Sequence, residues 1–250
     1  GDRILLRHDP GTAYTTPRRS PRTGGYRVVH EEAGFLVADK EPGVLTVPGA
    51  ARRGDSLLEL VEEAYRRRGH RDRRALAVHR IDRFTSGLVV LARPGPAFES
   101  LREQFASRRP ERVYLAGAEG RVEPESGELV HRLAENPKSR KVHAVRPGEE
   151  GRWSASSYRV IERFAHASLL EVRLRTGRRN QIRVQLAAGG HPLVGDVAYG
   201  NPSRLIGRTA LHARRLRFAH PSTGKPSVFE ATPPDDFRRL LSALRRGEKP

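Results

Sequence analysis

Hydrophobic residues recur along this chain at two spacings, one typical of strands and one typical of helices. Two short β-rich runs, at 26–30 and 35–39, flank the polar sequence EEAG and predict a hairpin. The uninterrupted apolar run SGLVVLA at 86–92 predicts a buried strand, and RVYLAGA at 112–118 predicts another. Apolar and charged residues alternate through LLEVRLR at 169–175, as they do in a strand with one buried face.

Four other segments space their apolar residues as an amphipathic helix does. They are 56–69, 96–109, 180–188 and 235–246. The first has clear boundary signals, because Ser56 and Glu59 form a capping box and Gly69 follows the last turn. Its charged face offers favourable pairs one turn apart: Glu62 with Arg66 and Glu63 with Arg67. The third helix begins just past Gly177, and we expect its first turn to face a phosphate or another anion.

Strands and helices do not alternate strictly, which favours an α+β fold with a mainly antiparallel sheet. A doubly wound sheet is the alternative. The polar stretch 123–153 is expected to form a hairpin or excursion on the surface. Residues 1–25 are rich in Gly, Pro, Ser, Thr and Arg after position 10 and predict a basic arm or linker, in which GDRILLR is the end of some smaller module. The main domain then spans 26–250.

Charge points to the class of partner. Lys and Arg number 47 against 29 Asp and Glu, a formal net charge of +18, which attracts polyanions and favours nucleic acid. An anionic membrane surface is the competing partner, but no basic amphipathic helix stands out and the longest apolar run, Leu88 to Ala92, is far too short to span a bilayer. The chain has no cysteine and no signal-peptide core, so we expect a soluble, cytoplasmic protein.

Several motifs of common enzyme classes are absent. The GK pair in STGKPS lacks the glycine of a phosphate-binding loop, and no GxGxxG, HExxH or GxSxG occurs. A nucleotide cofactor and a metal are therefore not expected, although a Ser-His-Asp triad stays open from spacing alone. The remaining candidate is Asp82 in HRIDRFTSG, where Arg80 and Arg83 favour the ionised carboxylate that a nucleophile or base requires. Taken alone, such an acid more often forms a structural salt bridge.

Five ordered motifs change that balance. The run HRIDRFTSGLVVLAR resembles the signature of the RluA-type (ribosomal large subunit) pseudouridine synthases, in which it carries the catalytic Asp. The other four are DKEPGVLTVPG at 39–49, ERVYLA at 111–116, TGRRNQIRVQLAAGGHPLVGDVAYG at 176–200 and LHARRLRFAHPSTG at 211–224. They keep the family order and extend over about Tyr26 to Phe237.

The resemblance implies a pseudouridine synthase-like α+β domain at 26–250, with a central mixed, mostly antiparallel sheet, flanking helices and a catalytic cleft. It implies an isomerase that converts uridine to pseudouridine in structured RNA by base flipping, with no cofactor and no metal. It also favours a monomer, and a small RNA-binding domain before residue 26. Ribosomal RNA is favoured over transfer RNA as the substrate.

The same resemblance assigns roles to individual residues. Asp82 takes the place of the catalytic carboxylate, attacking either the ribose or the pyrimidine ring. Tyr114 takes the place of the aromatic that stacks on the target base and assists removal of its C5 proton. Arg183 matches the arginine that pairs with this Asp and keeps it ionised. Arg80 matches an arginine that occupies the space a flipped base vacates.

General RNA contact or a structural role is the expectation for the remaining polar residues of these motifs. They are Arg83, Arg178 and Arg179, together with His191 and Asp196 as a hydrogen-bonded pair. Ile81, Asn180 and Gln185 depart from the usual family residues without removing the acid, the phenol or the arginine. Two rival functions stay open: a non-catalytic RNA-binding or ribosome-assembly protein that kept the fold, and a hydrolase that releases uracil.

Overall fold

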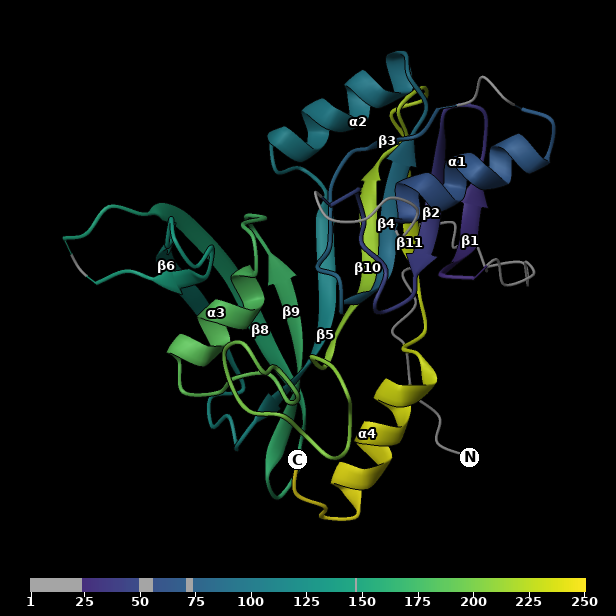
Figure 1. Cartoon of the computed structure of the whole chain (residues 1–250). Coiled ribbons are helices and arrows are strands. Elements are labelled where there is room, and N and C mark those ends of the chain that lie inside the picture. The colour runs from purple at the N-terminus through teal and green to yellow at the C-terminus, as the bar shows by residue number, and fades with distance from the viewer. Residues whose placement is uncertain (1–23, 50–55, 71–73, 147) are drawn as a thin grey trace.

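The computed structural model describes residues 24–49, 56–70, 74–146 and 148–250. Nearly all of the arm expected at 1–25 lies outside these ranges. Within them the chain forms one twisted mixed sheet of 11 strands with four helices (Figure 1). The α+β fold predicted from the sequence is confirmed.

The strand order across the sheet is β1-β2-β4-β10-β5-β9-β8-β6-β7, with β3 paired to β4 and β11 paired to β10. The strands are β1 (Tyr26–Glu31), β2 (Phe35–Lys40), β3 (Leu76–Ala77), β4 (Ser86–Ala92), β5 (Glu111–Glu119), β6 (Ser126–Glu135), β7 (Val142–Ala144), β8 (Arg152–Arg163), β9 (Ala167–Leu174), β10 (Leu211–Ala219) and β11 (Pro226–Glu230). Of the pairs between described strands, β4 with β10 is parallel and the others are antiparallel. The alternative of a doubly wound parallel sheet is therefore wrong.

The four helices are α1 (Leu57–Arg67), α2 (Pro96–Ala106), α3 (Gln181–Ala188) and α4 (Asp235–Arg245). Helices α1 and α3 pack into one apolar cluster, with residues such as Leu36 and Val89 of β2 and β4. Helix α2 packs against the alternate residues of the same strands, including Phe35 and Val90. Because successive side chains of a strand point to opposite faces, α1 and α2 cover opposite faces of the sheet. Helix α4 packs in a third cluster with β5 and β9.

Most local predictions are confirmed. Residues 26–39 form the hairpin of β1 and β2, and the polar stretch from 123 contains β6, β7 and the start of β8. The capping box of Ser56 and Glu59 is present, and Arg67 pairs with Glu63 at 3.0 Å. The expected pair of Glu62 with Arg66 is wrong: Arg66 also pairs with Glu63, at 2.8 Å, while Glu62 accepts a hydrogen bond from the backbone N of Ala75. No helix among the described residues is long and apolar enough to cross a membrane.

The start of β4 shows why its TSG sequence needs the glycine. Gly87 has φ +111°, in the left-handed region, and a Cβ atom added there would lie 2.2 Å from the carbonyl oxygen of Ala213. Glycine thus allows β4 to approach β10 where the two strands begin their parallel pairing. This junction immediately follows the loop that carries Asp82.

Candidate active site

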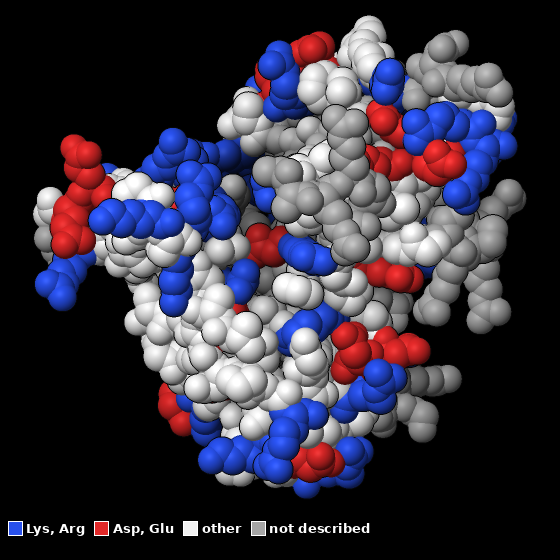
Figure 2. All heavy atoms as spheres, viewed as in Figure 1, with Lys and Arg blue, Asp and Glu red and all other residues white. Residues whose placement is uncertain are grey.

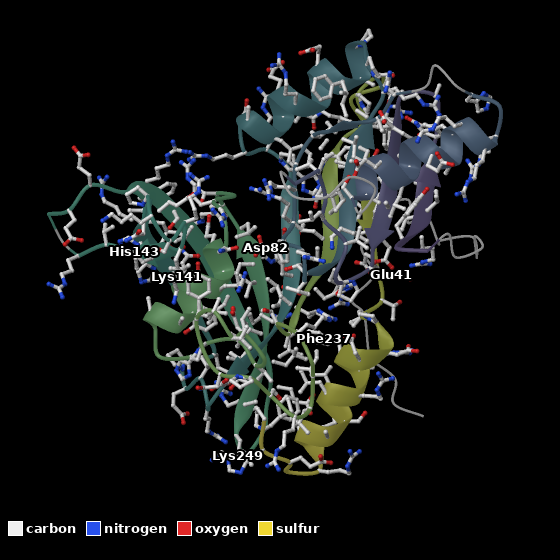
Figure 3. The ribbon with its side chains drawn as sticks, in the orientation of Figure 1. Glu41, Asp82, Lys141, His143, Phe237 and Lys249 are labelled. Carbon is white, nitrogen blue, oxygen red and sulfur yellow. The ribbon has the colours of Figure 1, made fainter. Side chains whose placement is uncertain are left out.

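A cleft with a cavity volume of about 510 Å³ opens between β5, the C-terminal half of α2, the N-terminal end of α3 and the loop at 78–85. Asp82, Tyr114 and Arg183 all line it, although they come from a loop, a strand and a helix far apart in sequence. Figure 3 labels Asp82 near the middle of the molecule, where β5 and β9 run side by side. The volume is within the range of small-ligand pockets, about 300–1,000 Å³.

The loop that carries Asp82 is held in place by the preceding loop, at 41–49. The Thr46 hydroxyl donates to the carbonyl oxygen of Ile81 at 2.9 Å and accepts from the Ile81 N–H at 3.2 Å. The fully buried Lys40 donates to three carbonyl oxygens, among them that of Arg83 at 3.1 Å. The backbone N of Gly43 donates to the same carbonyl oxygen at 2.8 Å. Three residues of the DKEPGVLTVPG motif, Lys40, Gly43 and Thr46, therefore position the candidate catalytic acid, and none of the three lines the cleft.

Arg183 connects two carboxylates. Its Nε and Nη2 donate to the two oxygens of Asp196, each at 2.7 Å, and its Nη1 lies 3.6 Å from Oδ2 of Asp82. Asp196 is fully buried, whereas the side chain of Asp82 is 26% exposed. Since the two bonds to Asp196 fix the plane of the guanidinium, the remaining nitrogen is directed toward the candidate catalytic acid.

Neighbouring residues complete the surroundings of Arg183. Asn180 accepts from its Nη1 at 3.2 Å, and the ring of Tyr199 lies 5.0 Å beneath the guanidinium. Asn180 in turn donates to the Tyr199 hydroxyl at 3.0 Å. The expected pair of His191 with Asp196 is wrong, because Asp196 is occupied by Arg183 and His191 Nδ1 lies 3.0 Å from the carbonyl oxygen of Glu119.

Burial and charge act on Asp82 in opposite directions. Burial at the bottom of the cleft raises the pKa of its carboxyl, and the positive charges of Arg183 and Arg80 lower it in part, with a net shift upward from 3.8. The quarter of the side chain that stays accessible faces the open cleft, while protein replaces water on its other sides. Arg83 does not serve the electrostatic role expected from the sequence. Its Nε bonds the carbonyl oxygen of Gly43 and its guanidinium lies over the ring of Phe84.

Tyr114 lies in the wall of the cleft and is 6% exposed. Burial raises the pKa of its phenol to about 12, and the charge of Asp82 acts in the same direction. The phenol is therefore protonated at neutral pH, which suits stacking and hydrogen bonding better than proton abstraction. Arg112, next to it in the cleft, has a buried Nε without a hydrogen-bond partner, and burial lowers the pKa of its guanidinium.

The four arginines expected to contact RNA are not equivalent. Arg80, Arg178 and Arg179 line the cleft, and Arg83 does not. Arg179 pairs with Glu135 at 3.1 Å. The end of the sheet formed by β6 to β9 carries crowded Lys and Arg side chains beside the central hollow (Figure 2). The N-terminal end of α3 borders the same cleft through Gln181 and Arg183, and that it faces a phosphate or another anion stays a prediction.

Sequence reasoning gave no role at the site to Lys40, Thr46 or Tyr199, and assigned Asp196 to the wrong partner. All four fall inside the quoted motifs, and that was the available signal: Asp196 and Tyr199 share a motif with Arg183, whereas Lys40 and Thr46 belong to a motif without a proposed catalytic residue. No group of three or more His, Asp or Glu among the described residues is placed to hold a metal ion. That the reaction needs neither a metal nor a cofactor stays a prediction.

Known proteins resemble this chain along most of its length. A sequence model for RNA pseudouridylate synthase matches residues 34–188. "Ribosomal large subunit pseudouridine synthase D" of Neisseria meningitidis serogroup A is 38% identical over 231 residues, which cover 87% of this chain and 61% of the relative. An "Uncharacterized RNA pseudouridine synthase" of Chlorobaculum parvum is 33% identical over 252 residues, covering 92% of this chain and 77% of the relative. This chain thus spans about three fifths of the first relative and about three quarters of the second.

Solved structures agree on the fold. "Human RNA Pseudouridylate Synthase Domain Containing 4" superposes with a TM-score of 0.71 at 24% identity, covering 87% of this chain and 92% of that one. A second human protein, "RNA Pseudouridylate Synthase Domain Containing 1", superposes with a TM-score of 0.68 at 25% identity, covering 90% and 96%. The family expected from the five motifs is confirmed, and with it the isomerase class. The chain belongs to the RNA pseudouridylate synthase family.

Proposed function

We propose that this protein isomerises uridine to pseudouridine in structured RNA, with Asp82 as the catalytic carboxylate. In the net reaction the bond from N1 of uracil to C1′ of ribose breaks and a bond from C5 to C1′ forms. The C5 hydrogen leaves as a proton and N1 gains one, so no oxidant or co-reactant is consumed. The observation that carries the proposal is the carboxylate of Asp82 at the bottom of the cleft, 3.6 Å from a guanidinium that Asp196 holds in place.

Tyr114 and Arg183 complete the proposed site. The ring of Tyr114 supports the uracil by stacking, and its neutral phenol can donate a hydrogen bond to the base. Arg183 offsets part of the effect of burial on Asp82 and therefore favours the ionised carboxylate that attack requires. From this position Asp82 can attack the ribose or the pyrimidine ring.

Base flipping follows from the depth of the acid. A uracil that is stacked inside a helix cannot reach a carboxylate at the bottom of a cleft, so the nucleotide must rotate out, at a cost of a few kcal/mol. Arg80 is exposed and lines the cleft, a position that suits filling the space the base leaves. Arg178 and Arg179 line the same cleft and suit contacts with the neighbouring phosphates.

Ribosomal RNA is the substrate we favour over transfer RNA. The support is the name of the Neisseria relative, which assigns that protein to the ribosomal large subunit. The net charge of +18 fits either substrate and does not discriminate between them.

Tritium release from RNA labelled at uridine C5 tests the proposal directly. Unmodified transcripts of large-subunit ribosomal RNA and of transfer RNA should be compared, with the wild-type protein and with Asp82→Asn. A matched control is Asp39→Asn, because the Asp39 side chain is similarly accessible, at 19%, and pairs with Arg27 outside the cleft. We expect release from ribosomal RNA by wild type and Asp39→Asn, and none by Asp82→Asn.

Retained release by Asp82→Asn would overturn the assignment of the acid. Release from transfer RNA alone would overturn the choice of substrate. Free uracil among the products would indicate the hydrolase, and RNA binding without release from either RNA would favour the non-catalytic protein.

A further inference from the structure

A cluster next to the cleft consists of the exposed Trp153 and three arginines, Arg108, Arg152 and Arg178. Trp153 lies at the start of β8, is 43% exposed and is the only tryptophan of the chain. The guanidinium of Arg108 lies 5.8 Å from the centre of the indole ring. Arg178 Nε donates to the backbone carbonyl oxygen of Trp153 at 3.3 Å. The indole therefore has one guanidinium beside its ring and a second arginine bonded to its backbone, while part of the ring stays in solvent.

The three arginines of this cluster carry positive charge that the described residues do not neutralise. Among the residues that the structure describes, no carboxylate forms an ion pair with Arg108, Arg152 or Arg178. The nearby Arg179, in contrast, pairs with Glu135. Burial and the charges of Arg108 and Arg152 lower the pKa of the Arg178 guanidinium. Like charges gathered without acids suit a polyanionic ligand.

The backbone at Arg108 adds a second observation. This residue has φ +59°, the left-handed conformation, just after Ser107 caps the C-terminal end of α2. Glycine is the usual residue at such a position, because a side chain is strained there. Arg108 lies in the lining of the cleft, where such a strained position is consistent with a role for its side chain.

The position of the cluster links it to the candidate active site. Arg108 and Arg178 line the same cleft as Asp82. Arg178 also lines a second hollow, of about 730 Å³, together with Arg132, Arg152 and Arg179. A strand of RNA with one nucleotide in the catalytic cleft would therefore pass the cluster as it leaves the cleft.

We propose that Trp153 stacks on an unpaired base next to the target uridine, while Arg108, Arg152 and Arg178 bind the flanking phosphates. This inference rests on the proposed function and assigns the substrate class more narrowly, to uridines in single-stranded loops. Indole faces accept any base, so the contact selects for an unpaired neighbour rather than for a sequence. Double-helical RNA keeps its bases stacked on one another and cannot offer one to the indole.

The single tryptophan makes the contact measurable, because all indole fluorescence comes from the proposed site. The probes are a single-stranded oligouridylate of about twelve nucleotides, within the usual range of single-strand site sizes, and a fully paired RNA duplex of equal length. The protein is the full chain carrying Asp82→Asn, so that binding is observed without turnover. We expect strong quenching at saturating oligouridylate and little at saturating duplex. Unchanged fluorescence at saturating oligouridylate, or equal quenching by the duplex, would overturn the proposal.

Affinity measurements, also on the Asp82→Asn protein, test how much the contact of Trp153 contributes to RNA binding. Trp153→Ala should weaken oligouridylate binding about 5- to 100-fold, and Trp153→Phe should restore most of the affinity. Ile161→Ala is the matched control, since Ile161 lies on the same strand and is 41% exposed. Replacing Arg108 or Arg152 by Ala should lower the slope of log affinity against log salt by about 0.7 each. Equal affinities of Trp153→Ala and Ile161→Ala would contradict the stacking.

Kinetic measurements distinguish the proposed isomerase function from the proposed contact of Trp153 with RNA. With Asp82 restored, Trp153→Ala should raise KM for tritium release and leave kcat nearly unchanged, because the indole binds a nucleotide that does not react. Tritium release with unquenched fluorescence would leave the proposed function intact and remove this contact. Quenching without tritium release from any RNA would support the contact of Trp153 with RNA and contradict the proposed function.

Discussion

At the scale of single residues, the site depends on how one arginine is shared between two acids. Arg183 forms two short bonds with Asp196 and one longer contact with Asp82. The buried acid therefore positions the arginine, and the accessible acid remains free to react. Removing Asp82 should therefore affect the protein differently from removing Asp196.

Asp82→Asn should abolish turnover without weakening the fold. Loss of an essential catalytic group costs roughly 10⁴-fold or more in kcat. The free energy of unfolding at pH 7 should be unchanged or higher, because the amide removes a carboxylate whose ionisation burial opposes, and Arg183 keeps Asp196 as its partner. Tritium release and urea denaturation measure the two effects. A variant that unfolds at lower urea than wild type would contradict this account of Arg183.

Asp196→Asn should weaken the fold and the reaction together. The guanidinium of Arg183 is largely buried, and the change takes away the carboxylate to which it makes both of its short bonds, which costs about 3 kcal/mol of unfolding free energy. In the fraction of the variant that stays folded we expect kcat to fall more than KM rises, because the guanidinium of Arg183 is no longer held in its orientation toward Asp82. His191→Ala is the control, because the ring of His191 bonds the Glu119 carbonyl oxygen instead of Asp196. Similar effects of the two variants would contradict the assignment.

At the scale of elements, two loops without regular structure hold the acid in place. The loop at 41–49 clasps the loop at 78–85 through Thr46, with help from Lys40 at the end of β2, and Gly87 lets the following strand enter the sheet. Hydrogen bonds of this kind restrict the positions that an acid on a loop can adopt.

Thr46→Val tests the clasp with a side chain of nearly the same shape. It removes the hydroxyl that both accepts from and donates to the backbone of Ile81, and it leaves those two buried groups unpaired. The expected cost is about 2 kcal/mol of unfolding free energy, with a lower kcat. Thr46→Ser keeps the hydroxyl and should lose much less of both. If Thr46→Val matched Thr46→Ser by denaturation and by tritium release, the clasp would have no role.

The presence of most helices and strands could be predicted from the sequence, because hydrophobic periodicity and helix capping depend on residues close together in the chain. The capping box at Ser56 and the alternation in β9 depend on neighbours within a few residues, and both are confirmed. The partners of Glu62 and Asp196 depend on which distant backbone or guanidinium reaches them first, and spacing does not encode that. The three proposed catalytic residues were found through motif register, since periodicity alone cannot show that a strand, a loop and a helix end converge.

At the scale of the whole molecule, a buried polar network joins the loop at 78–85, which carries Asp82, to helix α4. Arg208 makes two bonds to Asp236 of α4, at 2.6 and 2.9 Å, and a third to the carbonyl oxygen of Phe84 at 3.1 Å. His212 lies in the same network, 3.0 Å from the Ser86 hydroxyl and 3.1 Å from the carbonyl oxygen of Ala231. Since the carbonyl must accept from Nε2, Nδ1 of the neutral ring accepts from Ser86.

Acid should destabilise the whole fold through His212. Burial lowers the pKa of its imidazole from 6.5 to about 4, and the charges of Arg208 and Arg214 act in the same direction. Between these two values the unfolded chain binds a proton that the folded chain does not bind, so stability is complete above pH 6.5 and is lost as the pH falls toward 4. A pKa difference of this size corresponds to about 3 kcal/mol of unfolding free energy at about pH 4.

The measurement is urea denaturation at intervals between about pH 7.5 and about pH 4, a range that brackets both values, on wild type, His212→Asn and His70→Asn. His212→Asn should be less stable at neutral pH, because the packed ring is gone, yet its stability should fall less steeply with acid than that of wild type. His70 is exposed, so His70→Asn should follow the wild-type slope. His79, whose pKa burial lowers to about 3, contributes in the same direction in all three proteins, so it leaves the difference between slopes unaffected. Parallel slopes for wild type and His212→Asn would place the acid sensitivity elsewhere and would mean that the network tolerates a charged imidazole.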